Sequence, residues 1–232
     1  MIVLGIDASS DAATAGIVAD GKLLCEYTLN NGKNHSVKLL PMIEAMLSEA
    51  GLSFSDIDVY SCGVGLGSFT GVRIGVATAK GFAQSWNKPM VSLSSLQLLA
   101  ENLCGYAGLR VPCIHARVDE LFCAAYNADG EVVLPPSVMT VLELSDFLKD
   151  KTAMLCGDGA LEYAEELMQK NPGVTLCDRP SAHVIRGGAA AELGYKFAAI
   201  GNTISCEAME PVYLRLSQAE REYQARENGK NK

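Results

Sequence analysis

The sequence predicts an α/β protein made of two tandem lobes, each a mixed sheet of β-β-β-α-β-α order flanked by helices. Strand patterns with a hairpin turn at Asp20-Gly21 open the chain, and a helix, a strand and a helix follow. The same order of elements recurs from about residue 111. The length of 232 residues, 49% of them hydrophobic, is enough for one large core or two smaller ones.

The elements of the first half follow from residue periodicity and from turn residues. Alternating apolar residues around the Asp-Gly turn predict three antiparallel strands, at 2–7, 14–19 and 22–29. A helical pattern then ends at Gly51, where glycine favours termination. The remaining expected elements are a helix at 36–50, a strand at 58–64, a helix at 70–86, a strand at 90–92 and a helix at 94–103.

The second half repeats the order of elements without obvious sequence identity to the first. The expected elements are strands at 111–116, 121–127 and 131–134, a helix at 141–150, a strand at 153–157, a helix at 160–170, a strand at 174–177 and a helix at 183–200. Gly105 and Gly108 interrupt the pattern and predict a boundary between an N-terminal lobe, 1–104, and a C-terminal lobe, 105–216. The tail, 217–232, has few apolar residues, and we expect it to be solvated.

The composition excludes several classes of protein. The apolar content excludes disordered and fibrous chains, and a net charge of −8 disfavours a protein that grips a phosphate backbone on its own. Eight scattered cysteines without a CxxC pair predict reduced thiols in a cytoplasmic protein rather than disulfides or a metal site. No basic stretch precedes the first apolar run, and no apolar stretch reaches the roughly 20 residues of a membrane helix, so we expect neither a signal peptide nor a membrane partner.

The most informative stretch is the glycine-rich segment at residues 65–75, GLGSFTGVRIG, which joins a strand to a helix. Gly65 and Gly67 permit a tight turn, and Ser68 is placed to cap the helix. A helix N-terminus can bind an anion, but the Lys and the Ser or Thr of a P-loop do not follow Gly71. This segment alone fits two interpretations, a structural turn and a ligand-binding loop.

The two long helices of the first half have more apolar surface than one lobe is expected to cover. In the helix at 70–86, Arg73, Lys80 and Gln84 fall in a stripe about 40° wide, and nearly all other positions are apolar or small. In the helix at 36–50, the apolar arc spans about 160°, wider than the roughly 100° that docking on one core needs. Two explanations account for this apolar surface: the rest of the chain covers it, or it is a helical protein–protein interface. The residues that we assign to a partner-binding surface are Leu39, Leu40, Met42, Ile43, Met46, Leu47, Gly71, Val72, Gly75, Val76, Ala79 and Ala83.

Residue spacing reveals no catalytic or metal site. The histidines at 35, 115 and 183 form no HExxH or HxxxH pair. Asp7, followed by Ser9 and Ser10, stands where actin-like kinases hold a magnesium-handling carboxylate and a phosphate-binding hairpin. Because the turn lacks the glycine of a D-x-G-[ST] motif, we interpret Asp7, Ser9 and Ser10 as a vestigial nucleotide site. An ATPase or small-molecule phosphotransferase that uses Asp7 and the inter-lobe cleft is the alternative.

At these residues the chain resembles the TsaB (YeaZ) family, bacterial subunits of the machinery that makes tRNA threonylcarbamoyladenosine. The glycine-rich run is highly specific to that family. The chain departs from the family pattern at Leu66, where proline is usual, and at His115, where aspartate is usual. The runs that carry the resemblance lie at residues 6–9, 65–75, 77–81, 92–96 and 211–215.

The resemblance implies a two-lobed actin-like (ribonuclease H-like) fold and a non-catalytic role without metal or cofactor. It implies a partner, the paralogue TsaD, which has a metal-binding histidine pair and transfers threonylcarbamoyl to N6 of the adenosine next to the anticodon in tRNAs reading codons that begin with A. The first two helices are expected to pack on TsaD as a four-helix bundle that stabilises its active conformation, with the ATPase TsaE joining the assembly.

Two further expectations concern the other partners. Without TsaD, the same surface is expected to form a homodimer, as an isologous contact. Contact with tRNA is expected only indirectly, through the complex, and direct capture of tRNA by the basic residues of the tail is a further alternative.

Overall fold

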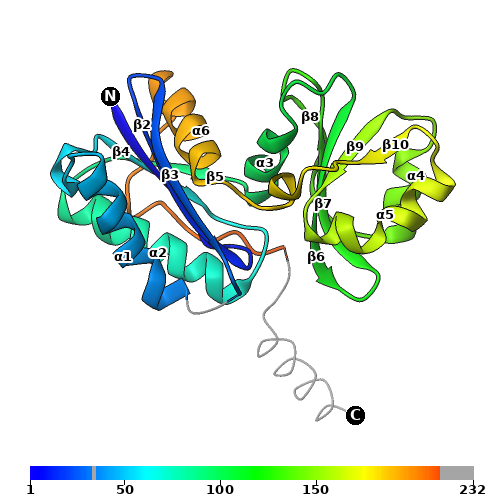
Figure 1. The fold of residues 1–232 in the computed structure, drawn as a ribbon, viewed down its shortest axis with the longest axis horizontal. Coiled ribbons are helices and arrows are strands. Elements are labelled where there is room, and N and C mark those ends of the chain that lie inside the picture. The colour runs from blue at the N-terminus through cyan, green and yellow to red at the C-terminus, as the bar shows by residue number, and fades with distance from the viewer. Residues whose placement is uncertain (33–34, 215–232) are drawn as a thin grey trace, which may run out of the picture.

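The structure, a computed structural model, describes residues 1–32 and 35–214. They form two five-stranded sheets flanked by helices (Figure 1). The strand order is β3-β2-β1-β4-β5 in the first sheet and β8-β7-β6-β9-β10 in the second, so the two sheets share one topology. This confirms the predicted α/β fold of two tandem actin-like lobes. The tail expected to be solvated, 217–232, lies outside the described residues.

The strands of the first sheet are β1 (Ile2–Asp7), β2 (Ala12–Ala19), β3 (Lys22–Asn30), β4 (Val59–Gly63) and β5 (Met90–Leu93). Those of the second sheet are β6 (Leu109–Arg117), β7 (Glu120–Tyr126), β8 (Val132–Thr140), β9 (Ala153–Cys156) and β10 (Val174–Leu176). The α-helices within residues 1–32 and 35–214 are α1 (His35–Glu49), α2 (Phe69–Ser85), α3 (Ser95–Ala100), α4 (Val141–Leu148), α5 (Asp158–Lys170) and α6 (Gly187–Ala199). The 3₁₀-helices of the described residues are η1 (Phe54–Asp56), η2 (Glu101–Leu103) and η3 (Pro180–His183).

The hairpin between β2 and β3 has the conformation that its sequence predicts. Asp20 and Gly21 both have positive φ angles, 49° and 78°, as a two-residue type I′ turn requires. β1 then pairs antiparallel with β2 and parallel with β4, which places it at the centre of the first sheet. The carboxyl end of β1, where Asp7 lies, is therefore at the middle of the lobe.

Three elements differ from their expected boundaries by more than two residues. β8 continues to Thr140 instead of ending at 134, because its prolines lie on an edge strand, where a missing N–H is tolerated. The helix expected at 94–103 is α3 followed by the tighter turn η2. The helix expected at 183–200 begins at Gly187, because Pro180 starts a separate turn, η3, ahead of it.

The helices that cover the first sheet come from both ends of the chain. α1 and α2 pack on one face of the sheet, whereas α6 packs on the other, against β1, β2 and β4 (Figure 1). Glycines allow this close approach of α6, because a Cβ atom on Gly5 would lie 2.2 Å from the backbone N of Ala191. A Cβ atom on Gly16 would lie 2.5 Å from the carbonyl of Gly187. The last helix of the chain is thus an integral layer of the first lobe.

The segment after α6 also returns to the first lobe. Ile204 forms a bridge with Met90 at the edge of the first sheet. The backbone N–H of Val212 donates to the carbonyl of Val64 (2.8 Å). The sequence predicts that residues 105–216 form the C-terminal lobe. This assignment is corrected for residues 187–214, which pack on the first sheet. The boundary after residue 104 stays a prediction.

The two lobes share one apolar core. A buried cluster joins Val3 and Val59 of the first sheet to Leu96 of α3 and to Ile114 and Ala124 of the second sheet. The other face of the second sheet is covered by α4 and α5, which enclose a separate core. Among the described residues, no helix is both long enough and apolar enough to span a bilayer.

Candidate functional site

Asp7 is buried at the end of β1 and is bound entirely by groups of the same chain. Its carboxylate accepts hydrogen bonds from the backbone N–H of Ser9 (2.9 Å), the Ser9 hydroxyl (2.9 Å) and the Ser95 hydroxyl (3.4 Å). Burial raises the pKa of Asp7 to about 6, although the two serines act in the opposite direction. A Cβ atom on Gly63 would lie 1.9 Å from Oδ2, so the neighbouring strand leaves no space beside the carboxylate.

The turn after Asp7 is covered by the glycine-rich segment. The carbonyl of Ser9 accepts a hydrogen bond from the backbone N–H of Ser68 (2.6 Å), and a Cβ atom on Gly67 would lie 2.2 Å from that carbonyl. Ser10 accepts from the backbone N–H of Ala12 (3.2 Å), and its carbonyl accepts from Nε2 of His35 (2.8 Å). The structure thus brings the predicted Asp7, Ser9 and Ser10 together in one hydrogen-bonded turn. The glycine-rich segment packs directly on this turn and occupies the space that a ligand would need beside it.

In the second lobe, a carboxylate lies at the start of α5, beside β6. Oδ1 of Asp158, in the first turn of α5, accepts hydrogen bonds from the backbone N–H groups of His115 (3.2 Å) and Gly159 (2.9 Å). The His115 ring pairs with Glu162 on the same helix. Backbone N–H groups at a helix N-terminus attract anions, and here the protein supplies the anion itself.

A small cavity lies between the lobes in the part of the chain that the structure describes. It has a volume of about 200 Å³ and is lined by both lobes, including Asp11, Ile114, Asp158 and His183. Pockets for small molecules and cofactors are roughly 300–1,000 Å³ in size and mostly apolar. Carboxylates at the lining and the small volume both disfavour a bound nucleoside triphosphate.

Most residues assigned to a partner-binding surface are buried inside the chain. The exceptions are Leu40, which is 42% exposed, and Met42, which is half-buried. The assigned residues of α2 are buried because this helix packs closely on the rest of the first lobe. A Cβ atom on Gly71 would lie 2.0 Å from the carbonyl of Ala8. The expected surface is corrected for these buried positions: Leu39, Ile43, Met46, Leu47, Gly71, Val72, Gly75, Val76, Ala79 and Ala83.

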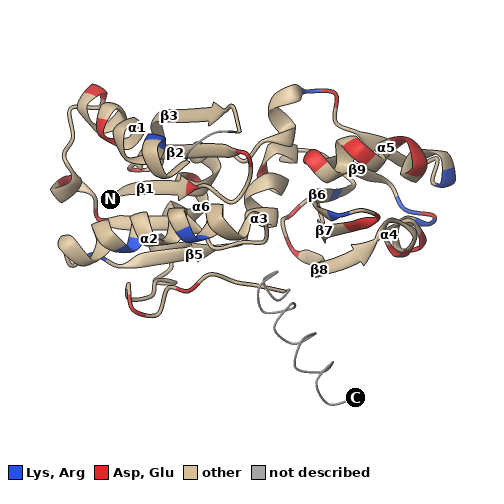
Figure 2. Ribbon diagram, turned by 90° about the horizontal axis from the view of Figure 1, so that it is seen from below, with Lys and Arg blue, Asp and Glu red and all other residues tan. Residues whose placement is uncertain are grey.

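The opposite faces of α1 and α2 are exposed and carry few charges. In Figure 2, α1 and α2 both carry charged positions, and α5 is the more acidic helix. The exposed charged residues of α1 are Lys38, Glu44 and Glu49. On α1 the face includes Val37, 61% exposed, and Leu40. On α2 it includes Ala77 and Gly81, with no described residue within 4 Å of a Cβ built on Gly81. We name these exposed residues, together with Pro41 and Ala45, the outer helical face; the exposed Glu44 and Ser48 of α1 lie among them on the same face.

The two cations of α2 hold the C-terminal segment rather than lying free in solvent. Nε of Arg73 donates to the hydroxyl of Tyr213 (2.9 Å), and its guanidinium carbon lies 3.9 Å from the centre of the Phe69 ring. Nζ of Lys80 donates to the carbonyl of Met209 (2.9 Å). Sequence reasoning missed these contacts because the partners are 140 and 129 residues apart in the chain. The late Pro-Val-Tyr-Leu run is the local sign of them.

The chain matches a family of known proteins over most of its length. Residues 22–223 match the profile of the family described as "TsaD: tRNA N6-adenosine threonylcarbamoyltransferase". The chain belongs to this family. Among the residues that the structure describes, no group of three or more His, Cys, Asp or Glu side chains is arranged to hold a metal ion.

Three curated relatives that are similar over nearly the whole chain are named TsaB. The tRNA threonylcarbamoyladenosine biosynthesis protein TsaB of Escherichia coli is 29% identical, over 93% of this chain and 95% of its own length. The TsaB protein of Bacillus subtilis is 28% identical, over 95% and 96%. The structure of YeaZ from Pseudomonas aeruginosa matches with a TM-score of 0.75 and 26% identity, over 92% of this chain and 99% of that one. These matches cover both lobes and the return of α6.

Proposed function

We propose that this chain is a non-catalytic subunit of the machinery that makes threonylcarbamoyladenosine in tRNA, and that it binds TsaD through the outer helical face. The observation that carries the proposal is the exposure of Val37 and Leu40 beside the small residues of α2 on the outer helical face, in a chain with three near-full-length relatives that are named TsaB. The internally bound Asp7 and Asp158 support a role without phosphoryl transfer, because both potential phosphate positions contain protein groups.

The proposed mechanism is scaffolding. α1 and α2 pack on an equivalent pair of TsaD helices as a four-helix bundle, which stabilises the conformation in which TsaD modifies N6 of the adenosine next to the anticodon. TsaE joins this assembly, and without TsaD the outer helical face pairs with a second copy. A net charge of −8 fits a cytoplasmic subunit that leaves tRNA contact to its partners.

The experiment sizes the chain alone and mixed with TsaD, with one charge placed on each helix of the outer helical face. Leu40→Glu and Ala77→Glu change exposed side chains, so we expect both variants to keep the wild-type melting temperature. A buried unpaired charge in an interface costs several kcal/mol, roughly a hundredfold or more in affinity, so both should fail to co-elute with TsaD. Leu161→Glu is the matched control, because Leu161 is 55% exposed on α5 in the other lobe.

Two results would overturn this proposal. One is co-elution of both folded variants with TsaD at wild-type strength. The other is tight binding of ATP and magnesium with turnover that Asp7→Ala abolishes, which would favour the phosphotransferase alternative. Strong, salt-dependent binding of tRNA by the isolated chain would instead support direct tRNA capture.

A further inference from the structure

The four edges of the two described sheets are not equally protected against pairing with another strand. At β5, Met90 exchanges two backbone hydrogen bonds with Ile204 (2.9 and 2.8 Å). In the second sheet, β8 contains Pro135 and Pro136, which lack an N–H, and β10 has only three residues. The fourth edge strand, β3, has nine residues and no proline, and it pairs only with β2. Open edges are usually blunted, so an unprotected one indicates a place where another strand can pair.

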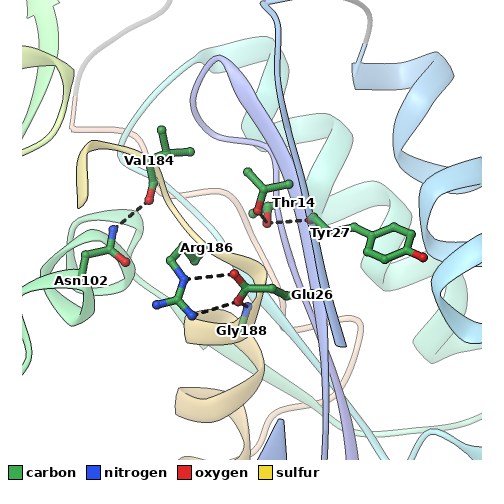
Figure 3. Close-up of polar contacts among 8 residues, drawn as sticks. Thr14, Glu26, Tyr27, Asn102, Val184, Arg186 and Gly188 are labelled. Carbon is green, nitrogen blue, oxygen red and sulfur yellow. Dashed lines mark hydrogen bonds and ion pairs between the residues drawn. The ribbon is translucent and has the colours of Figure 1, made fainter. Parts of the chain in front are cut away.

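The second half of β3 presents its backbone to the open edge in a defined pattern. The carbonyl of Tyr27 faces β2, because it accepts a hydrogen bond from the Thr14 hydroxyl (3.0 Å; Figure 3). The backbone groups of successive strand residues alternate in direction, so the N–H and carbonyl groups of Glu26 and Thr28 face away from β2. A shift in the pairing with β2 lies before Cys25 and leaves this half regular. These outward groups therefore have no strand partner within the described residues.

A groove lies between this half of β3 and the flank of α1. Its volume is about 560 Å³, and it is lined by residues 26–29 of β3 and by Lys38, Pro41 and Met42 of α1. An extended segment that pairs with β3 along this groove would direct every second side chain toward α1. Addition of a strand to an open sheet edge is a recurring mode of peptide recognition, in which backbone hydrogen bonds give affinity and neighbouring side chains give specificity.

The side chains at the groove define the chemistry of its occupant. Tyr27 lies on the α1 side of β3, and Met42 on α1 is half-buried, so both offer apolar surface (Figure 3). Lys38 is exposed, and it forms no ion pair within residues 1–32 and 35–214. Glu26 does not neutralise Lys38, because its carboxylate lies on the opposite side of β3, where Nε and Nη2 of Arg186 bind it at 3.1 Å (Figure 3). The groove therefore favours a segment with apolar and acidic side chains on the face that meets α1.

We propose that β3 and α1 form a docking groove for an extended acidic peptide segment of a partner protein, which adds to the first sheet as a sixth strand. The outward backbone groups of Glu26 and Thr28 bind the backbone of the segment. Its apolar side chains contact Tyr27 and Met42, and its carboxylates pair with Lys38. The groove lies beside the outer helical face and its occupation requires no TsaD, so its test is independent of the proposed function.

Calorimetric titration of the full chain with two synthetic peptides tests the charge preference. The acidic peptide DTVTVTD has the same order of side chains in both strand directions, and KTVTVTK is its matched control with the same length and the same valines. Both peptides are acetylated and amidated. DTVTVTD should bind about tenfold more tightly, because Lys38 attracts one peptide and repels the other. In Lys38→Glu, the order of the two affinities should reverse.

A second pair of variants tests the pairing of the backbones. Thr28→Pro removes an N–H that faces away from β2, so the variant should keep the wild-type melting temperature while its affinity for DTVTVTD falls tenfold or more. Thr28→Ala keeps this N–H and is the matched control, so it should bind the peptide as the wild type does.

Three outcomes overturn the docking groove. One is equal affinity of the wild type for the two peptides, or no measurable binding of DTVTVTD. Another is wild-type affinity in folded Thr28→Pro; if this variant does not fold, the charge reversal in Lys38→Glu decides alone. The third is self-association of the chain that Thr28→Pro abolishes and Leu40→Glu leaves intact, since β3 would then pair with a second copy.

Discussion

The buried carboxyl of Asp7 predicts a specific pH dependence of stability. Its pKa is raised by burial to about 6, against a usual value of 3.8, so the folded state binds the proton more tightly than the unfolded state. The stabilisation from this group is present below about pH 4 and is lost as the pH rises through about 6. Its size is on the order of 3 kcal/mol, because each pKa unit corresponds to about 1.4 kcal/mol.

Asp7→Asn isolates this effect from the other titrating groups. The amide keeps hydrogen-bonding partners in Ser9 and Ser95 but does not ionise, so the variant should become more stable relative to wild type as the pH rises from 4 to 7. Urea unfolding of both proteins across this range measures the difference in unfolding free energy. A difference that stays constant with pH would show that Asp7 does not titrate in this window.

At the scale of the element, the glycines of α2 distinguish the side of the helix that faces the sheet from the side that faces solvent. A Cβ atom on Gly71 would lie 2.0 Å from the backbone carbonyl of Ala8, so Gly71→Ala should destabilise the fold by about 2 kcal/mol or more. On Gly75 the nearest atom would be 3.5 Å away, an ordinary contact, and Gly81 faces open space among the described residues. Gly75→Ala and Gly81→Ala should each stabilise by up to about 1 kcal/mol, because alanine favours a helix interior.

Urea unfolding of these three variants tests how α2 sits on the sheet. Equal effects at positions 71 and 81 would contradict the buried and exposed sides assigned here. Larger changes on the inner side, such as Gly75→Arg, are unsuitable probes of partner binding because they would disrupt the packing of the helix on β4.

The helices themselves were predictable, whereas their buried sides were not. Periodicity and the cap at Ser68 located α2 to within a residue of its observed ends. The helical wheel measured the width of the apolar arc but contains no information on which protein surface covers each part of it. The ridge at Gly71, Gly75 and Ala79 was assigned to a partner for this reason, although the sheet of the same lobe covers it. Asp7, Ser9 and Ser10 lie in one hydrogen-bonded turn because they are close in sequence, and their assignment to a vestigial nucleotide site stays a prediction.

At the scale of the whole molecule, the return of α6 is the feature that local sequence patterns could not predict. Periodicity identifies a helix near residues 183–200 but does not say on which sheet it packs. The signals that could have found it are small residues of α6 that lie against small residues of the sheet: Gly187 against Gly16, Ala191 against Gly5, and Gly194 against Ser61. Matching small residues on distant elements indicate close approach, but only once the partner is known.

This return predicts that the two lobes unfold together. The first sheet needs α6 from the far end of the chain to cover one face, and the shared apolar core joins both sheets through α3. The single tryptophan, Trp86, lies at the end of α2 and reports only on the first lobe, whereas far-ultraviolet circular dichroism reports on both. The two signals should therefore give the same thermal midpoint. A fragment of residues 1–104 should not fold, since it would leave the α6 face of β1 and β2 in water, and a cooperative melt of that fragment would show that the lobes are separable units.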